Sequence, residues 1–314
     1  MREASIRPAI LITKPLEAEC AAALENHFEV HTLVGAADPE AVLAAHAAEI
    51  RGIAGGRVQG ALMRRLPKLE IIANSGVGID TNDTQAARER GVAITNTPDV
   101  LNDAVAELTV GLMLALARAL PRADRYVRDG SWKGGPFGLG SELRGKTVGM
   151  LGLGRIGKEI AARLAAMKME VCYFARNEKP DEPYRYYADL TRMAADSDWL
   201  VAIAPANAST AGIVTREVLE ALGPAGNFVN VARGSLVDQP AMIELLEGGD
   251  LGGAALDVFD GEPDVPGALR ALDNVVVSPH MGSRTVEARL AMDRLVVDNL
   301  VAHFEGRQPP NRVI

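Results

Sequence analysis

The chain has little of what marks secreted, membrane or metal proteins. Cys20 and Cys172 are its only cysteines, and both lie in apolar-periodic segments, which predicts small buried side chains and neither a disulfide nor a metal site. No apolar run is long enough to cross a bilayer, and the N-terminus lacks the basic-then-apolar pattern of a secretory signal. We therefore expect a cytoplasmic protein without a membrane partner.

Positive charge is also scarce. There are 33 Lys and Arg residues against 41 Asp and Glu residues, which gives a formal net charge of -8. No basic run is present, so nucleic acid is not an expected partner. Because the overall field repels anions, an anionic substrate would need local arginines and backbone N–H groups. The composition, with 48% hydrophobic residues, is that of a globular protein, and 314 residues suffice for two domains.

What the chain does have is an alternation of short apolar strands with helices, in two blocks. The first block has predicted strands at residues 9–13, 29–33, 50–54, 69–73 and 92–96, with helices at 16–27, 39–46, 59–66 and 84–90. The second has strands at 147–151, 170–174, 199–203, 227–230, 253–257 and 275–278. This alternation predicts an α/β protein with two Rossmann-like or flavodoxin-like domains, parallel sheets and a ligand cleft between them.

Two long helices are predicted outside these blocks. Residues 100–119 have a nearly continuous apolar surface, which favours burial between domains or subunits, and Pro121 is expected to end this helix. The amphipathic helix at residues 285–304 is expected to cross back to the first domain. The predicted domains are therefore a discontinuous substrate domain, 1–99 plus 286–314, and a dinucleotide-binding domain, 100–285.

The strongest local motif is a glycine turn between a strand and a helix. Gly152, Gly154 and Gly157 have the G-x-G-x-x-G spacing directly after the strand at 147–151. In a dinucleotide site the first glycine permits the turn, the second admits the pyrophosphate, and the third lets helix and strand pack closely. Free N–H groups at the start of the helix would hold the phosphates. An ordinary strand–helix turn is the alternative.

The end of the next strand bears on the choice of nicotinamide cofactor. An acid at this point binds the ribose 2′-hydroxyl of NAD, whereas an arginine accommodates the 2′-phosphate of NADP. The chain has Arg176 and Asn177 there and no acid. We therefore expect NADP(H), with NAD(H) as the second candidate; a solvated Arg176 is the alternative.

Three further strand ends offer an arginine, an acid and a histidine. Arg233, Glu262 and His280 follow successive predicted strands, at the sheet edge where open α/β sheets bind ligands. A guanidinium can hold a carboxylate and polarise the adjacent ketone, and an imidazolium can protonate the developing alkoxide. A carboxylate beside the histidine stabilises its charged form. Singly, each residue also has a structural interpretation.

Together these segments resemble the D-isomer-specific 2-hydroxyacid dehydrogenase family. The matching motifs are LGLGRIG at 151–157, NVARGSLVD at 230–238, LDVFDGEP at 256–263, SPHMGS at 278–283, NSGVGID at 74–80 and TNTPDV at 95–100. Within the family the chain is most similar to NADPH-dependent hydroxypyruvate, glyoxylate and hydroxyphenylpyruvate reductases, through YFARNEKP at 173–180 and GSWK at 130–133.

The resemblance implies roles for individual residues. Arg233 would bind the substrate carboxylate and ketone oxygen, His280 would donate the proton as a pair with Glu262, and the N–H groups of Val77 and Gly78 would bind the carboxylate. Asp257 would bind the nicotinamide carboxamide. The remaining implied cofactor contacts are Arg155, Ile156, Pro205, Val231, Ala232 and Gly282. Pro205-Ala-Asn departs from the usual Pro-Leu-Thr of the family. The resemblance also implies a homodimer through the helix at 100–119 and the arm after it.

The expected activity is NADPH-dependent reduction of a small 2-keto acid, hydroxypyruvate or glyoxylate, to the D-2-hydroxy acid. One alternative is a bulkier substrate, phenylpyruvate or hydroxyphenylpyruvate; another is a dinucleotide-sensing corepressor scaffold with little turnover. A phosphoglycerate dehydrogenase is less favoured because no regulatory domain follows Ile314. Trp132 and Arg57 are candidate substrate contacts, with arm packing and a surface position as their respective alternatives.

Overall fold

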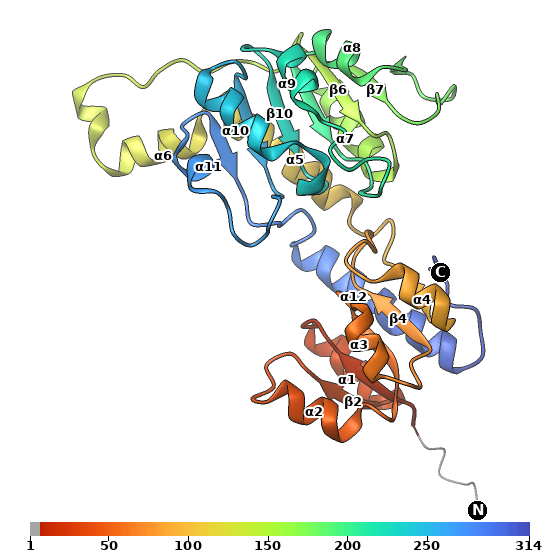
Figure 1. Ribbon diagram of the computed structural model, residues 1–314. Helices are drawn as coiled ribbons and strands as arrows, with labels where there is room; N and C mark the ends of the chain where they lie inside the picture. Colours follow the sequence, from red (N-terminus) through yellow and green to blue (C-terminus); the bar gives the residue numbers. More distant parts are fainter. Residues whose placement is uncertain (1–6) are drawn as a thin grey trace, which may run out of the picture. The chain divides into compact units, whose positions relative to one another are not determined.

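The protein is described here by a computed structural model covering residues 7–314, and it consists of two compact units (Figure 1). Unit 1 extends to Leu101 and resumes at Arg284–Ile314, and unit 2 is Asn102–Ser283. Both sheets contain only parallel pairs, so the predicted α/β class with two parallel sheets is confirmed.

Unit 1 is a five-stranded parallel sheet covered on both faces. The strand order is β2-β1-β3-β4-β5. The strands are β1 (Ala9–Ile12), β2 (Glu29–Thr32), β3 (Ile50–Gly55), β4 (Ile71–Asn74) and β5 (Ala93–Thr95). The helices are α1 (Ala18–His27), α2 (Pro39–His46), α3 (Gly60–Arg65), α4 (Thr84–Arg90) and α12 (Val286–Phe304).

The alternation of side chains along β1 shows how unit 1 builds two cores. Ala9 and Leu11 belong to a cluster with residues of α2, α3 and α4, whereas Ile10 and Ile12 belong to a cluster with residues of α1 and α12. Successive side chains of a strand point to opposite faces, so a strand buried on both sides is apolar throughout. Helix α12 thus covers the same face of this sheet as α1.

Unit 2 is a seven-stranded parallel sheet with the order β12-β11-β10-β9-β6-β7-β8. The strands are β6 (Thr147–Leu151), β7 (Glu170–Phe174), β8 (Arg185–Tyr187), β9 (Trp199–Ala202), β10 (Asn227–Asn230), β11 (Gly253–Leu256) and β12 (Val275–Val277). The α-helices are α5 (Asn102–Ala117), α6 (Leu120–Arg128), α7 (Arg155–Ala166), α8 (Leu190–Ala195), α9 (Arg216–Leu222), α10 (Gln239–Gly248) and α11 (Gly267–Ala271).

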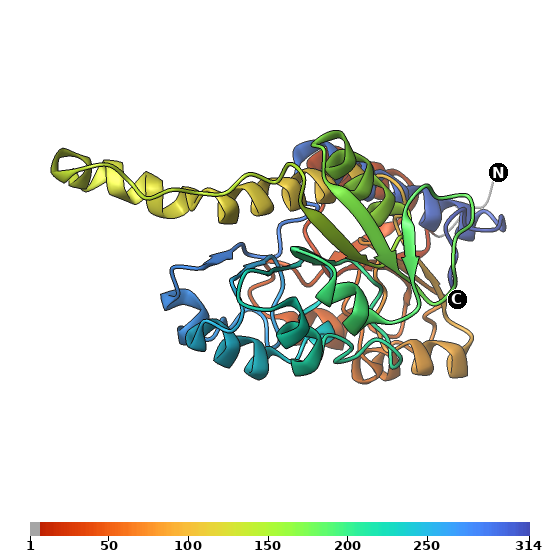
Figure 2. The ribbon, with the colours of Figure 1, turned by 90° about the horizontal axis from the view of Figure 1, so that it is seen from above.

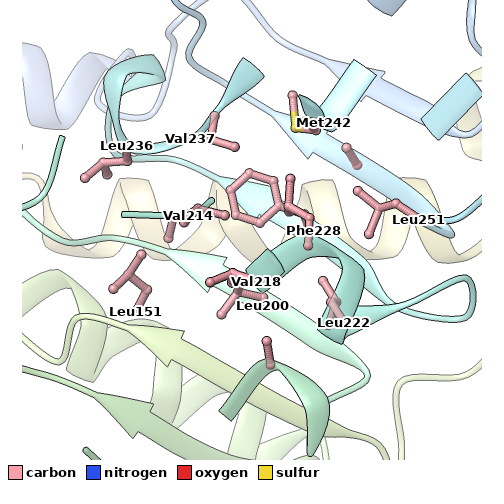
Figure 3. Close-up of a cluster of buried hydrophobic side chains, with 14 of the residues drawn as sticks. Leu151, Leu200, Val214, Val218, Leu222, Phe228, Leu236, Val237, Met242 and Leu251 are labelled. Atoms are coloured by element: carbon pink, nitrogen blue, oxygen red, sulfur yellow. The ribbon is translucent and has the colours of Figure 1, made fainter. Parts of the chain in front are cut away.

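One face of this sheet is sealed by a large hydrophobic cluster (Figure 3). Phe228 from β10 lies at its centre, among residues of β6, β9 and helices α9 and α10. On the other face, α5 packs against α7 and β11. Starting from β6, the chain adds β7 and β8 on one side and β9 to β12 on the other. Open parallel sheets bind ligands at such a switch point, here at the carboxyl ends of β6 and β9.

The structure corrects two sequence-based expectations about unit 2. Pro121 does not end the helical region: α5 ends at Ala117, Ala119 takes a left-handed conformation (φ 48°), and Pro121 lies in the first turn of a second helix, α6. Proline is well accommodated there because it needs no N–H acceptor. The strand β8 was missed as well, because Arg185-Tyr-Tyr has no apolar run.

Helix α6 and the short 3-10 helix η1 (Ser131–Gly134) project away from the sheet of unit 2 (Figure 2). Their apolar side chains are exposed, with Trp132 at 65% and Val127 at 56% of full accessibility. Within residues 7–314 no single helix is long and apolar enough to span a membrane; only α5 and α6 taken together pass on length and composition, across a 61° bend.

Candidate active site

The glycine turn after β6 has the shape that its spacing predicts. Gly152 has φ 103°, and a Cβ atom there would lie 3.0 Å from the backbone of Ala204, which follows β9. A Cβ at Gly157 would lie 2.6 Å from the carbonyl oxygen of Gly152. At Gly154 a Cβ would meet nothing within 4 Å. Two glycines therefore allow close packing, and the third leaves an open approach to the backbone.

The start of α7 is suited to an anion. Its N-cap residue is Gly154, whose lack of a side chain leaves the first turn without a side-chain cap. The N–H groups of Ile156 and Gly157 lie in this first turn, where an α-helix supplies no acceptor. A diphosphate there would meet both N–H groups and the positive end of the helix dipole. These residues thus fit the dinucleotide expected from the sequence.

The loop after β7 carries Arg176 and Asn177, both exposed. Two tyrosines shape it: the hydroxyl of Tyr173 accepts a hydrogen bond from the N–H of Lys179 (2.7 Å), and that of Tyr186 donates to the carbonyl of Ala175 (3.3 Å). The Arg176 guanidinium is thus carried by an anchored loop and is open to solvent, as a side chain that receives a 2′-phosphate must be.

The loop after β9 contains Pro205, which is exposed. Its carbonyl oxygen accepts hydrogen bonds from the hydroxyl of Thr210 (2.7 Å) and the side-chain amide of Asn207 (3.3 Å). Asn207 is one of the two residues, with Ala206, at which the chain departs from the Pro-Leu-Thr pattern, and here its side chain holds the turn together. Pro205 therefore has a defined place beside the glycine turn.

The loop after β10 is held by the side chain of Asn230, the last residue of the strand, which is fully buried. Its side-chain oxygen accepts from the N–H of Ala232 (3.1 Å), and its amide donates to the carbonyl of Arg233 (2.8 Å). A Cβ at Gly234 would lie 2.0 Å from the backbone of Phe259, beyond the end of β11. Val231 and Ala232 are buried, whereas Arg233 is partly exposed. This turn therefore brings Arg233 next to the loop after β11.

Asp257, directly after β11, holds the loop at residues 278–282, which carries His280. Its buried carboxylate accepts hydrogen bonds from the hydroxyl of Ser278 (2.6 Å) and from the N–H groups of Met281 (2.8 Å) and Gly282 (2.9 Å). Its carbonyl oxygen accepts from the N–H of His280 (2.9 Å). Asp257 and Gly282 thus position the loop itself, and their contact with a cofactor stays a prediction.

His280 and Glu262 form a hydrogen-bonded pair. His280 Nδ1 lies 2.7 Å from one carboxylate oxygen of Glu262, and the other oxygen accepts from the N–H of Phe259 (3.0 Å). His280 has φ 48°, an uncommon conformation for a side-chain-bearing residue and one that functional loops often hold. The Glu262 carboxylate thereby fixes the orientation of the imidazole ring and leaves its other nitrogen available.

The electrostatics of the pair favour an ionised carboxylate. Burial opposes ionisation, but hydrogen bonds from His280 and the Phe259 N–H, together with the charges of His280 and Arg233, lower the pKa of Glu262 below its ordinary value. Arg233 is thus among the charges that lower this pKa, and it belongs to unit 2, as do Glu262 and His280. A carboxylate hydrogen-bonded to an imidazole is an arrangement that general acid–base catalysis uses.

In unit 1, the loop after β4 turns its carbonyl groups inward. The side-chain amide of Asn74 donates to the carbonyls of Gly76 and Gly78 (both 3.1 Å), and that of Asn96 donates to the carbonyl of Val77 (3.0 Å). Within residues 7–314, the N–H groups of Val77 and Gly78 donate to no protein acceptor. These two N–H groups are therefore available to an anion such as a carboxylate.

Sequence reasoning missed the residues that hold these loops, namely Asn74, Asn82, Asn96 and Asn230. Asn82 lies behind Asn74: its amide donates to the Asn74 side-chain oxygen (2.9 Å), and its own oxygen accepts from the N–H of Val58 (3.0 Å). The available signal was the position of Asn74 and Asn230 as the last residues of buried strands, where a polar side chain must find partners within the protein.

A cluster elsewhere in unit 1 brings together Glu29, His31 and His46, whose potential ligand atoms lie within 4.8 Å of one another. The two imidazole rings are stacked, with centroids 3.8 Å apart and an interplanar angle of 19°. Their in-plane lone pairs therefore run side by side and do not converge on one point, which is unlike the arrangement of a zinc site.

A glycine turn at the sheet's switch point and a hydrogen-bonded His–Glu pair beside an arginine define a dinucleotide-dependent oxidoreductase. Comparison with known proteins gives the family. The model of the D-isomer specific 2-hydroxyacid dehydrogenase, NAD binding domain, matches residues 110–282. The chain therefore belongs to the D-isomer-specific 2-hydroxyacid dehydrogenase family and is an NAD(P)-dependent enzyme, which confirms the resemblance inferred from its motifs.

Several relatives match nearly the whole chain. Hydroxyphenylpyruvate reductase of Plectranthus scutellarioides is 48% identical over 268 residues, covering 84% of this chain and 86% of the relative. Glyoxylate/hydroxypyruvate reductase A of Arabidopsis thaliana is 44% identical over 301 residues, covering 95% and 96%. The solved structure of an NADPH-dependent glyoxylate/hydroxypyruvate reductase from Sinorhizobium meliloti, in complex with NADP and malonate, superimposes with a TM-score of 0.92 at 42% identity, covering 98% and 97%.

Proposed function

We propose that the protein reduces a small 2-keto acid, hydroxypyruvate or glyoxylate, to the D-2-hydroxy acid with NADPH as the preferred cofactor. The observation that carries the proposal is the His280–Glu262 pair at 2.7 Å, within the electrostatic reach of Arg233. The names of the Arabidopsis and Sinorhizobium relatives support the substrate class and the use of NADPH.

The cofactor is assigned to the carboxyl end of the unit 2 sheet. The backbone of the first turn of α7, Arg155 to Gly157, is assigned to its diphosphate, Gly154 allows the close approach, and Arg176 and Asn177 receive the 2′-phosphate. Pro205, Val231, Ala232, Asp257 and Gly282 complete the proposed contacts. When bound, NADPH supplies a hydride to the carbonyl carbon of the substrate.

Arg233 and His280 act on the substrate oxygens. The guanidinium of Arg233 binds the carboxylate and draws electron density from the adjacent ketone oxygen. The imidazolium of His280 then protonates that oxygen, and Glu262 stabilises the charged ring and holds its orientation. In unit 1, the N–H groups of Val77 and Gly78 are assigned to the substrate carboxylate. They suit an anion because their loop carbonyls are engaged elsewhere.

Replacing the histidine tests these roles. His280→Ala removes the proton donor and leaves the glycine turn intact, so the rate of NADPH oxidation with hydroxypyruvate is expected to fall about 10²- to 10⁴-fold. NADPH binding, measured by fluorescence titration, is expected to stay within about threefold of wild type. His303→Ala, which replaces a histidine of unit 1 outside the proposed site, is the matched control. Retained turnover in His280→Ala contradicts the assignment.

A bulkier substrate is the second candidate, because the Plectranthus relative is a hydroxyphenylpyruvate reductase with 48% identity. Measuring kcat/KM for hydroxypyruvate and for hydroxyphenylpyruvate distinguishes the two candidates. A larger kcat/KM for the smaller keto acid supports the main proposal, and the reverse order supports the second candidate.

We also propose that the protein is a homodimer that forms through the arm of α6 and η1. Leu120, Val127 and Trp132 are exposed apolar side chains on this arm, and Leu139 is another just after it. Such a concentration usually marks an interface. Analytical ultracentrifugation is expected to give twice the chain mass for wild type and for the control Val286→Asp, which replaces an exposed valine of unit 1. Val127→Asp is expected to shift the mass towards the monomer; a monomeric wild type refutes the proposal.

A further inference from the structure

A partly buried lysine, Lys14, and a fully buried aspartate, Asp293, both contact Ser75, at the start of the loop that carries Val77 and Gly78. The side chain of Asp293, from α12, is fully buried in unit 1. One of its oxygens accepts from the N–H of Glu17 (2.8 Å), and the other lies 3.5 Å from the hydroxyl of Ser75. Lys14, which follows β1, donates from Nζ to the carbonyl of Ser75 (3.1 Å).

Ser75 is the residue from which the loop departs. Its N–H donates to the carbonyl of Gly55 at 2.5 Å, and its carbonyl and hydroxyl face Lys14 and Asp293. Ser75 is thus held from three sides, two residues ahead of the first N–H assigned to the substrate. A shift of Ser75 would move Gly76 and Val77 with it, because a peptide chain has only two soft dihedrals per residue.

We propose that Lys14 and Asp293 are positioning residues that set the loop at 75–78 for the carboxylate of a 2-keto acid, and that the charge of Lys14 is required for tight substrate binding. This inference rests on the proposed function, which assigns the carboxylate to the N–H groups of Val77 and Gly78. The residues assigned to proton transfer and to the cofactor belong to unit 2, whereas Lys14 and Asp293 belong to unit 1.

The surroundings of the lysine make its charge sensitive to pH. Burial and, after it, the charges of Arg289, Arg57 and Arg284 together lower the pKa of Lys14 to about 8, while Asp293 acts in the opposite direction. Burial also raises the pKa of Asp293, against the effects of the Glu17 N–H, Arg289 and Lys14.

The same groups bear on the attraction of an anion. The chain has a net charge of -8, yet Lys14 lies in the combined field of three arginines. As pH rises through about 8, Lys14 loses its proton, and both the charged hydrogen bond to Ser75 and one local positive charge are lost. Substrate binding is therefore expected to weaken in this range.

Steady-state kinetics of the full-length protein test the proposal. For Lys14→Met, which keeps the length of the side chain and removes the charge, we expect the KM for hydroxypyruvate to rise about tenfold, as for the loss of a charged hydrogen bond. The kcat is expected to change by less than about threefold, and the Kd for NADPH to be unchanged. Lys68→Met, which replaces an exposed lysine of the same unit, is the matched control.

The pH profile supplies a second, independent readout. In wild type and Lys68→Met, KM is expected to rise above pH 8 or so, whereas Lys14→Arg, which stays charged, is expected to lack this rise. The residues assigned to proton transfer are the same in all these variants, so the difference between the pH profiles isolates Lys14.

Each outcome has a distinct meaning. A wild-type KM in Lys14→Met, even with a lowered melting temperature, overturns the proposal and leaves Lys14 a structural role. If Lys14→Met does not fold, an unaltered pH profile in Lys14→Arg overturns the proposal on its own. An absence of wild-type turnover with any 2-keto acid refutes the proposed function itself, and with it the substrate role of the loop.

Discussion

The turn after β6 in unit 2 and the loop after β4 in unit 1 present backbone N–H groups in two different ways. Both follow a buried parallel strand and both are rich in glycine. In unit 2 the conformation of the turn depends on glycine having no side chain, because a Cβ at Gly152 or Gly157 would collide with the backbone. In unit 1 the conformation of the loop depends on two side-chain amides, because those of Asn74 and Asn96 donate hydrogen bonds to the loop carbonyls.

The difference explains why one of these sites was easier to recognise in the sequence. A glycine spacing is a local signal, since its steric reasons lie mostly within the turn itself. A carbonyl held by Asn96, which lies beyond the next strand, depends on which strands become neighbours. Anion-binding loops shaped by distant amides therefore need the fold before they can be interpreted.

Among the substitutions in unit 2, we expect a change at Arg176 to have the largest effect on cofactor binding. Arg176→Asp removes the guanidinium and puts a negative charge where the 2′-phosphate is expected. We predict that the Kd for NADPH rises about 100-fold and that for NADH changes less than about threefold, as for the loss of charge-assisted hydrogen bonds. Parallel fluorescence titrations measure both; Arg192→Asp, on α8, is the control. Equal losses for the two cofactors would rule out the 2′-phosphate role.

In unit 1, we expect a substitution of Asn74 to weaken substrate binding. Asn74→Ala removes two hydrogen bonds to loop carbonyls, so we expect the KM for hydroxypyruvate to rise about tenfold with an unchanged Kd for NADPH. Gln85→Ala, which removes an exposed amide of α4, controls for a general loss of stability. A rise in the NADPH Kd in place of the KM would show that the two loops do not have separate roles.

A pair of glycine variants separates packing from ligand approach. Gly157→Ala forces a Cβ to within 2.6 Å of a backbone oxygen, so we expect the free energy of unfolding to fall by about 1–3 kcal/mol. Gly154→Ala meets no atom within 4 Å, so its unfolding is expected to match wild type while NADPH binds more weakly. Urea denaturation and fluorescence titration give the two quantities. Equal destabilisation in both variants would argue against the division of roles.

The smallest predicted effect concerns Glu262 and pH. Because its folded pKa is lowered, Glu262 contributes stability at pH values above its ordinary pKa, and this contribution is lost as pH falls through the folded value. Wild type is therefore expected to lose slightly more stability on acidification than Glu262→Gln, by less than about 1 kcal/mol. Urea denaturation across a pH series measures this difference; a larger loss in Glu262→Gln would reverse the sign.

Much of the architecture followed from local patterns, and the exceptions have physical causes. All strands of both sheets except β8 were predictable, because most of them are buried on both faces and are therefore short apolar runs. Helix α6 was missed because Pro121 suits either the end of one helix or the first turn of the next, and only the reversal at Ala119 decides between them. Arg233, Glu262 and His280 were found from their residue types at strand ends. The loop-organising role of Asp257 was missed, because it depends on the chain near Gly282 folding back onto β11.

The most direct test of the central claim is the initial rate of nicotinamide oxidation by the purified wild-type protein. NADPH and NADH are each paired with hydroxypyruvate, glyoxylate and hydroxyphenylpyruvate, and the loss of reduced nicotinamide absorbance is followed. The account predicts the largest kcat/KM for NADPH with hydroxypyruvate or glyoxylate. Tight NADPH binding without oxidation by any of these keto acids would contradict it, and would favour a dinucleotide-sensing role for the same fold.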